Sequence, residues 1–119
     1  MTVRCVFSVN IDIQTFCALL QLRNTGLTEL PFSINSLVNL KECGLEDNKI
    51  ASLPADFGTQ MASLEKLWLS NNHLEWLPEN FGEGLTALRE LSLDINYLQV
   101  GQNLLEPYFV FFVVSDVGL

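Results

Sequence analysis

The 119-residue chain has little of several residue types on which common functions depend. A single histidine and three cysteines offer few ligands for zinc and too few thiols for a disulfide scaffold. Six lysines and arginines stand against 14 acids, and the resulting charge of −8 repels phosphate groups. We therefore expect no metal site and no nucleic acid among the partners of this protein.

Long apolar runs and the glycine patterns of nucleotide-binding loops are also missing from the sequence. The longest apolar run, residues 108–114, is too short to cross a membrane. No P-loop or dinucleotide motif occurs, and the carboxylates are spread along the chain rather than paired beside apolar residues. We predict no transmembrane span, no catalytic residue and no cofactor, and hence a protein that is not an enzyme.

Leucine is the most abundant residue type, asparagine is frequent beside it, and this bias favours an internal repeat. The stretches "LKECGLEDNKIASLPADF", "LEKLWLSNNHLEWLPENF" and "LRELSLDINYLQV" begin at the evenly spaced positions Leu40, Leu64 and Leu88. A weaker copy, "CALLQLRNTGLTELPFSI", begins at Cys17, and its distance to the second copy is shorter by one residue. Each copy reads apolar-x-x-apolar-x-Leu-x-x-Asn-x-apolar, and the first three continue x-x-Leu-Pro-x-x-Phe, with Ile34 as the final residue of the first.

The repeated leucines predict short strands. Leu67 and Leu69 alternate with residues expected at the surface, which is the period of a strand with one buried face. One such strand cannot bury its leucines alone, so stacked copies should pair as a parallel sheet over a shared core. The asparagine that follows each strand can satisfy the backbone of the turn, while Thr25 in the first copy has only one hydroxyl. We expect a hydrogen-bonded ladder of Asn48, Asn72 and Asn96.

The segments between the strands begin with a proline, which suits the first position of a helical turn. We therefore expect short helical or 3-10 turns opposite the sheet, with Phe57 and Phe81 filling the core from that side. Trp76 should pack against Pro78, with exposure to solvent as the alternative. Further apolar contacts are expected from Val38, Met61 and Leu85, and Cys17 and Cys43 stand at core leucine positions as small hydrophobes.

These motifs resemble the leucine-rich repeat family, pattern LxxLxLxxNxL, over roughly residues 17–101. The LPxxF continuation and the length of the period are similar to the intracellular Ras-associated, or scribble-like, group of that family. The resemblance implies an α/β fold, a leucine-rich-repeat solenoid or horseshoe with a concave parallel sheet and short helical or 3-10 turns on the convex side. It also implies a cytoplasmic protein-interaction module that serves as a scaffold or signalling adaptor.

The repeat register divides the chain into three parts. About four repeats are expected at residues 17–39, 40–63, 64–87 and 88–101, the last of them partial. Residues 1–16 are interpreted as an N-terminal cap or a degenerate repeat, with a secretory signal peptide as the alternative. Residues 102–119 form an apolar tail, interpreted as a buried C-terminal cap, a docking surface, the end of a truncated chain or non-native coding. Further repeats or domains in a longer native chain are therefore expected if the chain is truncated.

The same register predicts which side chains lie on the concave face. Trp68 is expected at the centre between Gly44 and Ser92, either as an exposed anchor for a partner or folded over the glycine. Neighbouring columns of alternating charge should form cross-strand salt bridges, which leaves them less suited to hold a partner. These columns are Lys41, Glu65 and Arg89 beside Glu42, Lys66 and Glu90. The predicted partner-binding residues are Gln21, Arg23, Glu46, Asp47, Trp68, Ser70, Ser92 and Asp94.

The sequence thus predicts protein–protein recognition on the concave face. The identity of the partner is open, but its surface should offer lysine or arginine around an apolar group, because acids border Trp68. Two alternatives also remain open. One is a regulatory segment of a larger enzyme such as a kinase or GTPase, and the other is a fragment of an extracellular receptor ectodomain.

Overall fold

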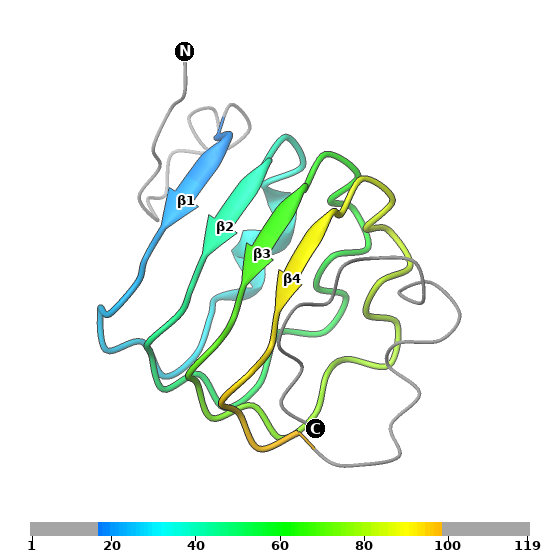
Figure 1. Cartoon of the computed structure of the whole chain (residues 1–119). Helices are drawn as coiled ribbons and strands as arrows, with labels where there is room; N and C mark the ends of the chain where they lie inside the picture. Colours follow the sequence, from blue (N-terminus) through cyan, green and yellow to red (C-terminus); the bar gives the residue numbers. More distant parts are fainter. Residues whose placement is uncertain (1–16, 99–119) are drawn as a thin grey trace.

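Four short strands form one parallel sheet in the computed structural model, which describes residues 17–98 (Figure 1). The strands are β1 (Leu19–Gln21), β2 (Glu42–Gly44), β3 (Lys66–Trp68) and β4 (Glu90–Ser92), and they lie side by side in chain order. Leu20 pairs with Cys43, Cys43 with Leu67, and Leu67 with Leu91. The pairing register of the sheet therefore follows the period of the sequence, as the repeat predicted.

Each strand buries its middle residue, and the residues on either side are half-buried except Gly44 in β2, which is buried. The middle residues have no exposed surface, and a second leucine column, two positions further along the chain, is buried as well. Burying one such side chain contributes about 1.5–3 kcal/mol, and only the neighbouring repeats supply the surface against which it is buried. The two columns are Leu20, Cys43, Leu67 and Leu91, followed by Leu45, Leu69 and Leu93.

The predicted asparagine ladder is present. Asn72 Nδ2 donates hydrogen bonds of 3.0 Å to the carbonyl oxygen of Leu69 in its own turn and to that of Leu45 in the preceding turn. Its Oδ1 accepts a hydrogen bond of 3.1 Å from the N–H of Ile50. Each such amide therefore joins two consecutive repeats through their backbones. The same arrangement recurs at Asn48 and Asn96.

The first turn differs because Thr25 replaces the asparagine. Its hydroxyl donates to the carbonyl oxygen of Leu22 at 2.7 Å, and the backbone N–H of the same threonine donates to Asn48 Oδ1 at 3.0 Å. A hydroxyl has one proton where an amide has two, so Thr25 cannot also donate to a preceding repeat. The ladder is thus reduced in the first described repeat, as expected.

Short turns connect the strands on the other side of the coil. Residues Phe32–Ser36 form the 3-10 helix η1, the one helix among residues 17–98. It begins after Pro31, and the N–H of Ile34 donates to the carbonyl oxygen of that proline at 3.1 Å. The fixed φ of proline favours this first turn, which agrees with the prediction of 3-10 turns opposite the sheet.

The second and third repeats begin their turns in the same way but do not continue as a helix. The N–H of Phe57 donates to the carbonyl oxygen of Pro54 at 3.2 Å, but Asp56 and Gly58 adopt left-handed φ angles of 63° and 92°. That conformation interrupts a helical series and accommodates the extra residue of the longer repeats. The rings of Phe57 and Phe81 stack with their centroids 6.3 Å apart, which places both in the core as predicted.

The prediction that Val38 contributes the apolar contact of the first repeat is wrong. Val38 is 39% exposed, and Leu37, at 1%, is buried in its place. The first repeat is shorter than the others by a single position, so Leu37 precedes Leu40 by the same interval as Met61 precedes Leu64. The position of the buried apolar residue is therefore fixed by its distance to the next strand and not by its distance from the proline.

The terminal segments 1–16 and 102–119, and the last residues of the partial repeat, lie outside the described residues. The cap, signal-peptide and apolar-tail interpretations therefore stay predictions, as do the repeat boundaries.

Replacing Asn72 with alanine should lower the stability of the folded chain by about 2–3 kcal/mol, because it removes an amide that satisfies buried backbone groups of two repeats. The measurement is the midpoint of urea unfolding, followed by far-UV circular dichroism. Gln60→Ala serves as the matched control, since Gln60 is exposed and its loss should change stability by less than about 0.5 kcal/mol. Equal midpoints for the two variants would contradict the structural role of the ladder.

Candidate functional site

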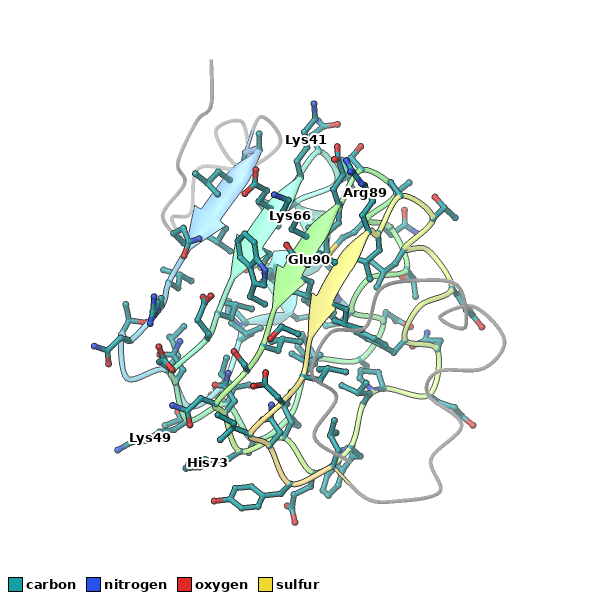
Figure 2. All side chains as sticks on the ribbon, in the orientation of Figure 1. Lys41, Lys49, Lys66, His73, Arg89 and Glu90 are labelled. Atoms are coloured by element: carbon teal, nitrogen blue, oxygen red, sulfur yellow. The ribbon has the colours of Figure 1, made fainter. Side chains whose placement is uncertain are left out.

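The outward-facing side chains of the four strands form the concave face, which carries the candidate site. Figure 2 shows Lys66 and Glu90 over the sheet, Lys41 and Arg89 where their strands begin, and Lys49 and His73 beyond the opposite end. The strand register aligns Gln21, Gly44, Trp68 and Ser92 in one row across the sheet. Two positions further along each repeat lies a second row, formed by Arg23, Glu46, Ser70 and Asp94. It is aligned by hydrogen bonds from the backbone N–H groups of Asn24, Asp47 and Asn71 to the carbonyl oxygens of Glu46, Ser70 and Asp94.

Trp68 is partly exposed at the centre of this face and is held by polar neighbours. Its Nε1 donates a hydrogen bond of 3.2 Å to Glu90 Oε2, and the ammonium of Lys66 lies 6.0 Å from the ring centroid. A cation at this distance from an indole is attracted by its π-system. The ring therefore has a preferred orientation, which lowers the entropy that a binding partner would have to remove.

Gly44 lies next to Trp68 in the row and is buried. The atoms nearest to a Cβ added at Gly44 would be those of the Gln21 amide, which would have to move to make room. The side chain of Gln21 thus lies over the glycine from the β1 side. Both sequence-based interpretations of Trp68 considered its own ring beside Gly44, and neither included this glutamine.

The predicted cross-strand salt bridges form only in part. Within residues 17–98, Arg89 and Glu65 approach to 3.5 Å, and both side chains are well exposed, so this pair contributes little. Lys66 and Glu90, which are register partners on β3 and β4, instead both interact with Trp68. These two supports were not foreseen as site residues. The repeat register could have indicated the contact between Glu90 and Trp68, because Glu90 is the diagonal neighbour of Trp68 on the next strand.

A second polar cluster joins Arg23, Asp47 and Asn71 across three consecutive repeats. Arg23 Nε donates to Asp47 Oδ2 at 2.7 Å, and Asn71 Nδ2 donates to Asp47 Oδ1 at 3.0 Å. The hydrogen bond from Asn71, followed by the hydrogen bond and charge of Arg23, lowers the pKa of Asp47 below its ordinary value. The hydrogen bond to Asp47 raises the pKa of Arg23. Asp47 is therefore an anion whose carboxylate has a fixed orientation.

The backbone places Asp47 by a left-handed turn. Asn24, Asp47, Asn71 and Ile95 occupy the equivalent position in four repeats, with φ of 53°, 60°, 57° and 55°. Asparagine and aspartate tolerate a left-handed φ better than most residues. Their recurrence at this position was a sequence signal for the left-handed turn, and it was overlooked. The remaining predicted residues are polar and partly exposed, and Ser92 Oγ donates to Asp94 Oδ1 at 3.0 Å.

Three further features of residues 17–98 concern metal ligands, membrane spans and thiols. Within residues 17–98 no three histidine, cysteine or carboxylate side chains are grouped closely enough to hold a metal ion. The helix in this part of the chain is not long and apolar enough to cross a membrane. The buried thiol of Cys43 is free, and burial, followed by the charge of Glu46, raises its pKa to about 12. The side chain of Cys17 is buried, as predicted.

Stacked strand–turn units with a continuous core define a solenoid repeat protein. The family model for the leucine rich repeat matches residues 38–98, slightly more than half of the chain. The chain belongs to the leucine-rich repeat family, and the predicted fold is confirmed. Repeats of this family present an extended concave surface that typically binds protein partners.

Among solved structures, the chain is similar to a leucine-rich-repeat protein of Leptospira interrogans, with 30% sequence identity and a TM-score of 0.67. The match covers 78% of this chain and 24% of that protein, so the chain spans about a quarter of the length of that relative. No curated protein matches the chain.

The raised pKa of Cys43 predicts a loss of stability at alkaline pH. The unfolded thiol ionises near the ordinary value of 9.0, whereas the folded thiol does so near 12, so stability falls as pH rises between these values, by at most about 1.4 kcal/mol per pH unit. Below pH 9 the thiol keeps its proton in both states and this contribution is constant. Cys43→Ala lacks the effect, so the stability difference between wild type and this variant should shrink from pH 8 to pH 10.5 in urea unfolding.

Alkylation gives an independent readout of the same burial. The peptide that contains Cys43 should remain unmodified by iodoacetamide in the folded protein and become modified in urea, as judged by mass spectrometry. Rapid modification of the folded protein at pH 8 would contradict the buried, protonated thiol.

Proposed function

We propose that the chain is a protein-interaction module that binds its partner on the concave face, around Trp68. The observation that carries the proposal is the indole at the centre of the face, partly exposed and oriented by Glu90 and Lys66. Large oriented aromatics surrounded by polar groups are frequent anchors of protein interfaces. The proposed contact residues are Gln21, Arg23, Glu46, Asp47, Trp68, Ser70, Ser92 and Asp94.

The charge of the face indicates the chemistry of the partner. Its columns contain Glu42, Glu46, Asp47, Glu90 and Asp94 against only Lys66 and Arg23. An acidic surface attracts and orients a basic one. The partner should therefore present an apolar group, to cover Trp68, bordered by lysine or arginine. The same charge disfavours nucleic acid.

The LPxxF continuation of the repeats supports a cytoplasmic scaffold or signalling adaptor of the Ras-associated, scribble-like type. A regulatory segment of a larger enzyme would use the same face in the same way. The third candidate, an extracellular ectodomain, would differ in the redox state of its cysteines, because disulfides persist in oxidising compartments.

The redox state of Cys17 in cells separates the cytoplasmic and extracellular candidates. Cells are lysed in denaturant with N-ethylmaleimide, which labels reduced thiols, and the Cys17 peptide is analysed by mass spectrometry. A cytoplasmic protein should carry the label on Cys17 because the cytosol keeps thiols reduced. An unlabelled Cys17 beside a labelled Cys43 would instead support the ectodomain and contradict the cytoplasmic assignment.

Photo-crosslinking tests the concave face directly. A photoreactive amino acid at Ser70 should capture the partner from cells of the source organism, whereas the same group at the exposed Gln60, on the opposite side of the coil, should not. Trp68→Ala should reduce the Ser70 crosslink at least about tenfold, which corresponds to the loss of a hot-spot side chain. Circular dichroism must first show that the variant is folded. An undiminished crosslink in the folded variant would overturn the proposed site.

A further inference from the structure

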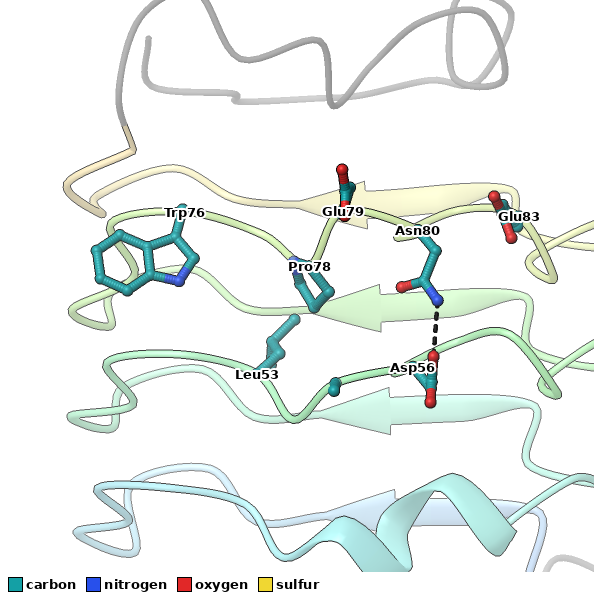
Figure 3. Close-up of a pocket in the computed structure, with 8 residues that line it drawn as sticks. Leu53, Asp56, Trp76, Pro78, Glu79, Asn80 and Glu83 are labelled. Carbon is teal, nitrogen blue, oxygen red and sulfur yellow. Dashed lines mark hydrogen bonds between the residues drawn. The ribbon is translucent and has the colours of Figure 1, made fainter.

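A second surface, away from the concave face, lies between the turns of the second and third repeats. It is a hollow of about 650 Å³ (Figure 3). Leu53, Ala55 and Asp56 from the second repeat line it on one side. The third repeat supplies Trp76, Pro78, Glu79, Asn80 and Glu83.

The hollow exists because the two turns differ in side-chain size. Trp76 stands in the column that holds Ser52 in the preceding repeat, and Glu79 stands in the column of Ala55. The small residues of the second repeat leave room beside the large ones of the third. The indole consequently remains 51% exposed, although it lines the same hollow as Pro78. Trp76 is therefore exposed, which was the alternative expectation, and its side chain lines the hollow together with Pro78.

The two ends of the hollow differ in chemistry. Figure 3 shows Trp76, Pro78 and Leu53 at one end and Asp56, Asn80 and Glu83 at the other. The first end is apolar, and the half-exposed indole beside Pro78 offers a flat surface for an apolar side chain. The second end is acidic. With Glu79, the hollow has three carboxylates and no lysine or arginine among its lining residues.

The acidic end is held in place across the two repeats. Asn80 Nδ2 donates a hydrogen bond of 2.7 Å to Asp56 Oδ1, drawn as the dashed line in Figure 3. The backbone of Asp56 adopts a left-handed φ of 63°, and its carbonyl oxygen accepts bonds from the N–H and hydroxyl of Thr59 at 3.1 and 2.9 Å. These bonds fix the carboxylate relative to the indole, so the spacing of the two ends is built into the fold.

The carboxylates of the hollow do not form a metal site, since no group of three metal-ligating side chains that could hold an ion occurs within residues 17–98. An elongated ligand with its own positive charge would balance the negative charge of these carboxylates in place of a metal ion. We propose that the hollow is a second interaction site that binds an extended peptide segment, with an apolar side chain against Trp76 and an arginine or lysine at the acidic end. This site goes beyond the proposed function, because it uses none of the concave-face residues.

The charge and shape of the hollow favour a peptide over other ligands. The three carboxylates repel nucleic acid and the headgroups of anionic membranes. A guanidinium or ammonium group would form charge-assisted hydrogen bonds to Asp56, Glu79 or Glu83, which are stronger than those between neutral groups. Apolar contact alone would leave these carboxylates without a counter-charge, which is why the proposal requires a basic residue.

Nuclear magnetic resonance of the whole chain tests the proposal, because the chain has two tryptophans and thus two indole N–H signals. Trp68→Phe and Trp76→Phe assign them. The probe is the blocked peptide acetyl-Leu-Arg-Gly-Arg-Leu-amide, and its counterpart with citrulline in place of arginine has nearly the same shape without the charge. The arginine peptide should shift the Trp76 signal saturably and more weakly at high salt, and this shift should persist in Trp68→Phe, whether or not the Trp68 signal of the wild type also moves.

Matched variants identify the acidic end. Glu79→Gln combined with Glu83→Gln should weaken binding of the arginine peptide at least about tenfold, and the citrulline peptide should bind the wild type about tenfold more weakly. Glu75→Gln is the control, because Glu75 is exposed beside Trp76 but does not line the hollow, and it should change binding less than about twofold.

Three outcomes would overturn the proposal. The first is the absence of any saturable shift at Trp76. The second is equal binding of the arginine and citrulline peptides, or an equal effect of the control variant, which would reduce the interaction to general attraction by the acidic chain. The third is a shift of Trp68 instead of Trp76, which would place the peptide on the concave face and support the proposed function alone.

Discussion

The buried asparagine amides are the interaction on which the rest of the structure depends. A parallel strand as short as β3 has few hydrogen bonds of its own, and the backbone leaving it has donors and acceptors that water does not reach. Asn72 satisfies these groups in two repeats at once, because its amide has donors for two carbonyls and an acceptor for one N–H. Stacking is therefore required for the asparagine as much as for the leucines. A single repeat would satisfy neither.

The fixed register that follows from this ladder also determines the surface. Because each repeat copies the backbone of the last, side chains about one period apart become neighbours, whatever their chemistry. Arg23 meets Asp47, and Trp68 meets Glu90, through this spacing alone. The core tolerates little change at its columns, while the outward columns can vary freely. The same scaffold therefore offers different surfaces, here an indole among acids on the concave face and an indole beside acids between two turns.

The sequence predicted those properties that follow from periodicity. The four strands, their parallel order, the leucine columns and the asparagine ladder all repeat, so each copy supports the interpretation of the others. Properties that depend on one particular side chain were not predicted. Gln21 covers Gly44, and Lys66 and Glu90 turn toward Trp68 and not toward one another, because a long side chain chooses among several neighbours at similar distance. Val38 was misplaced where the period itself changes by a single position.

Ile95 shows how strongly the backbone hydrogen bonds between stacked repeats determine the local conformation. It occupies the left-handed position that the preceding repeats fill with asparagine or aspartate, and a β-branched residue there costs about 1–2 kcal/mol. The side chain is 66% exposed and gains little from burial. Yet the carbonyl of Ile95 accepts a bond of 3.2 Å from the N–H of Asn72, and that of Asp94 accepts one of 3.0 Å from Asn71. The backbone of the fourth repeat is therefore set by the third through hydrogen bonds, against the conformational preference of its own residue.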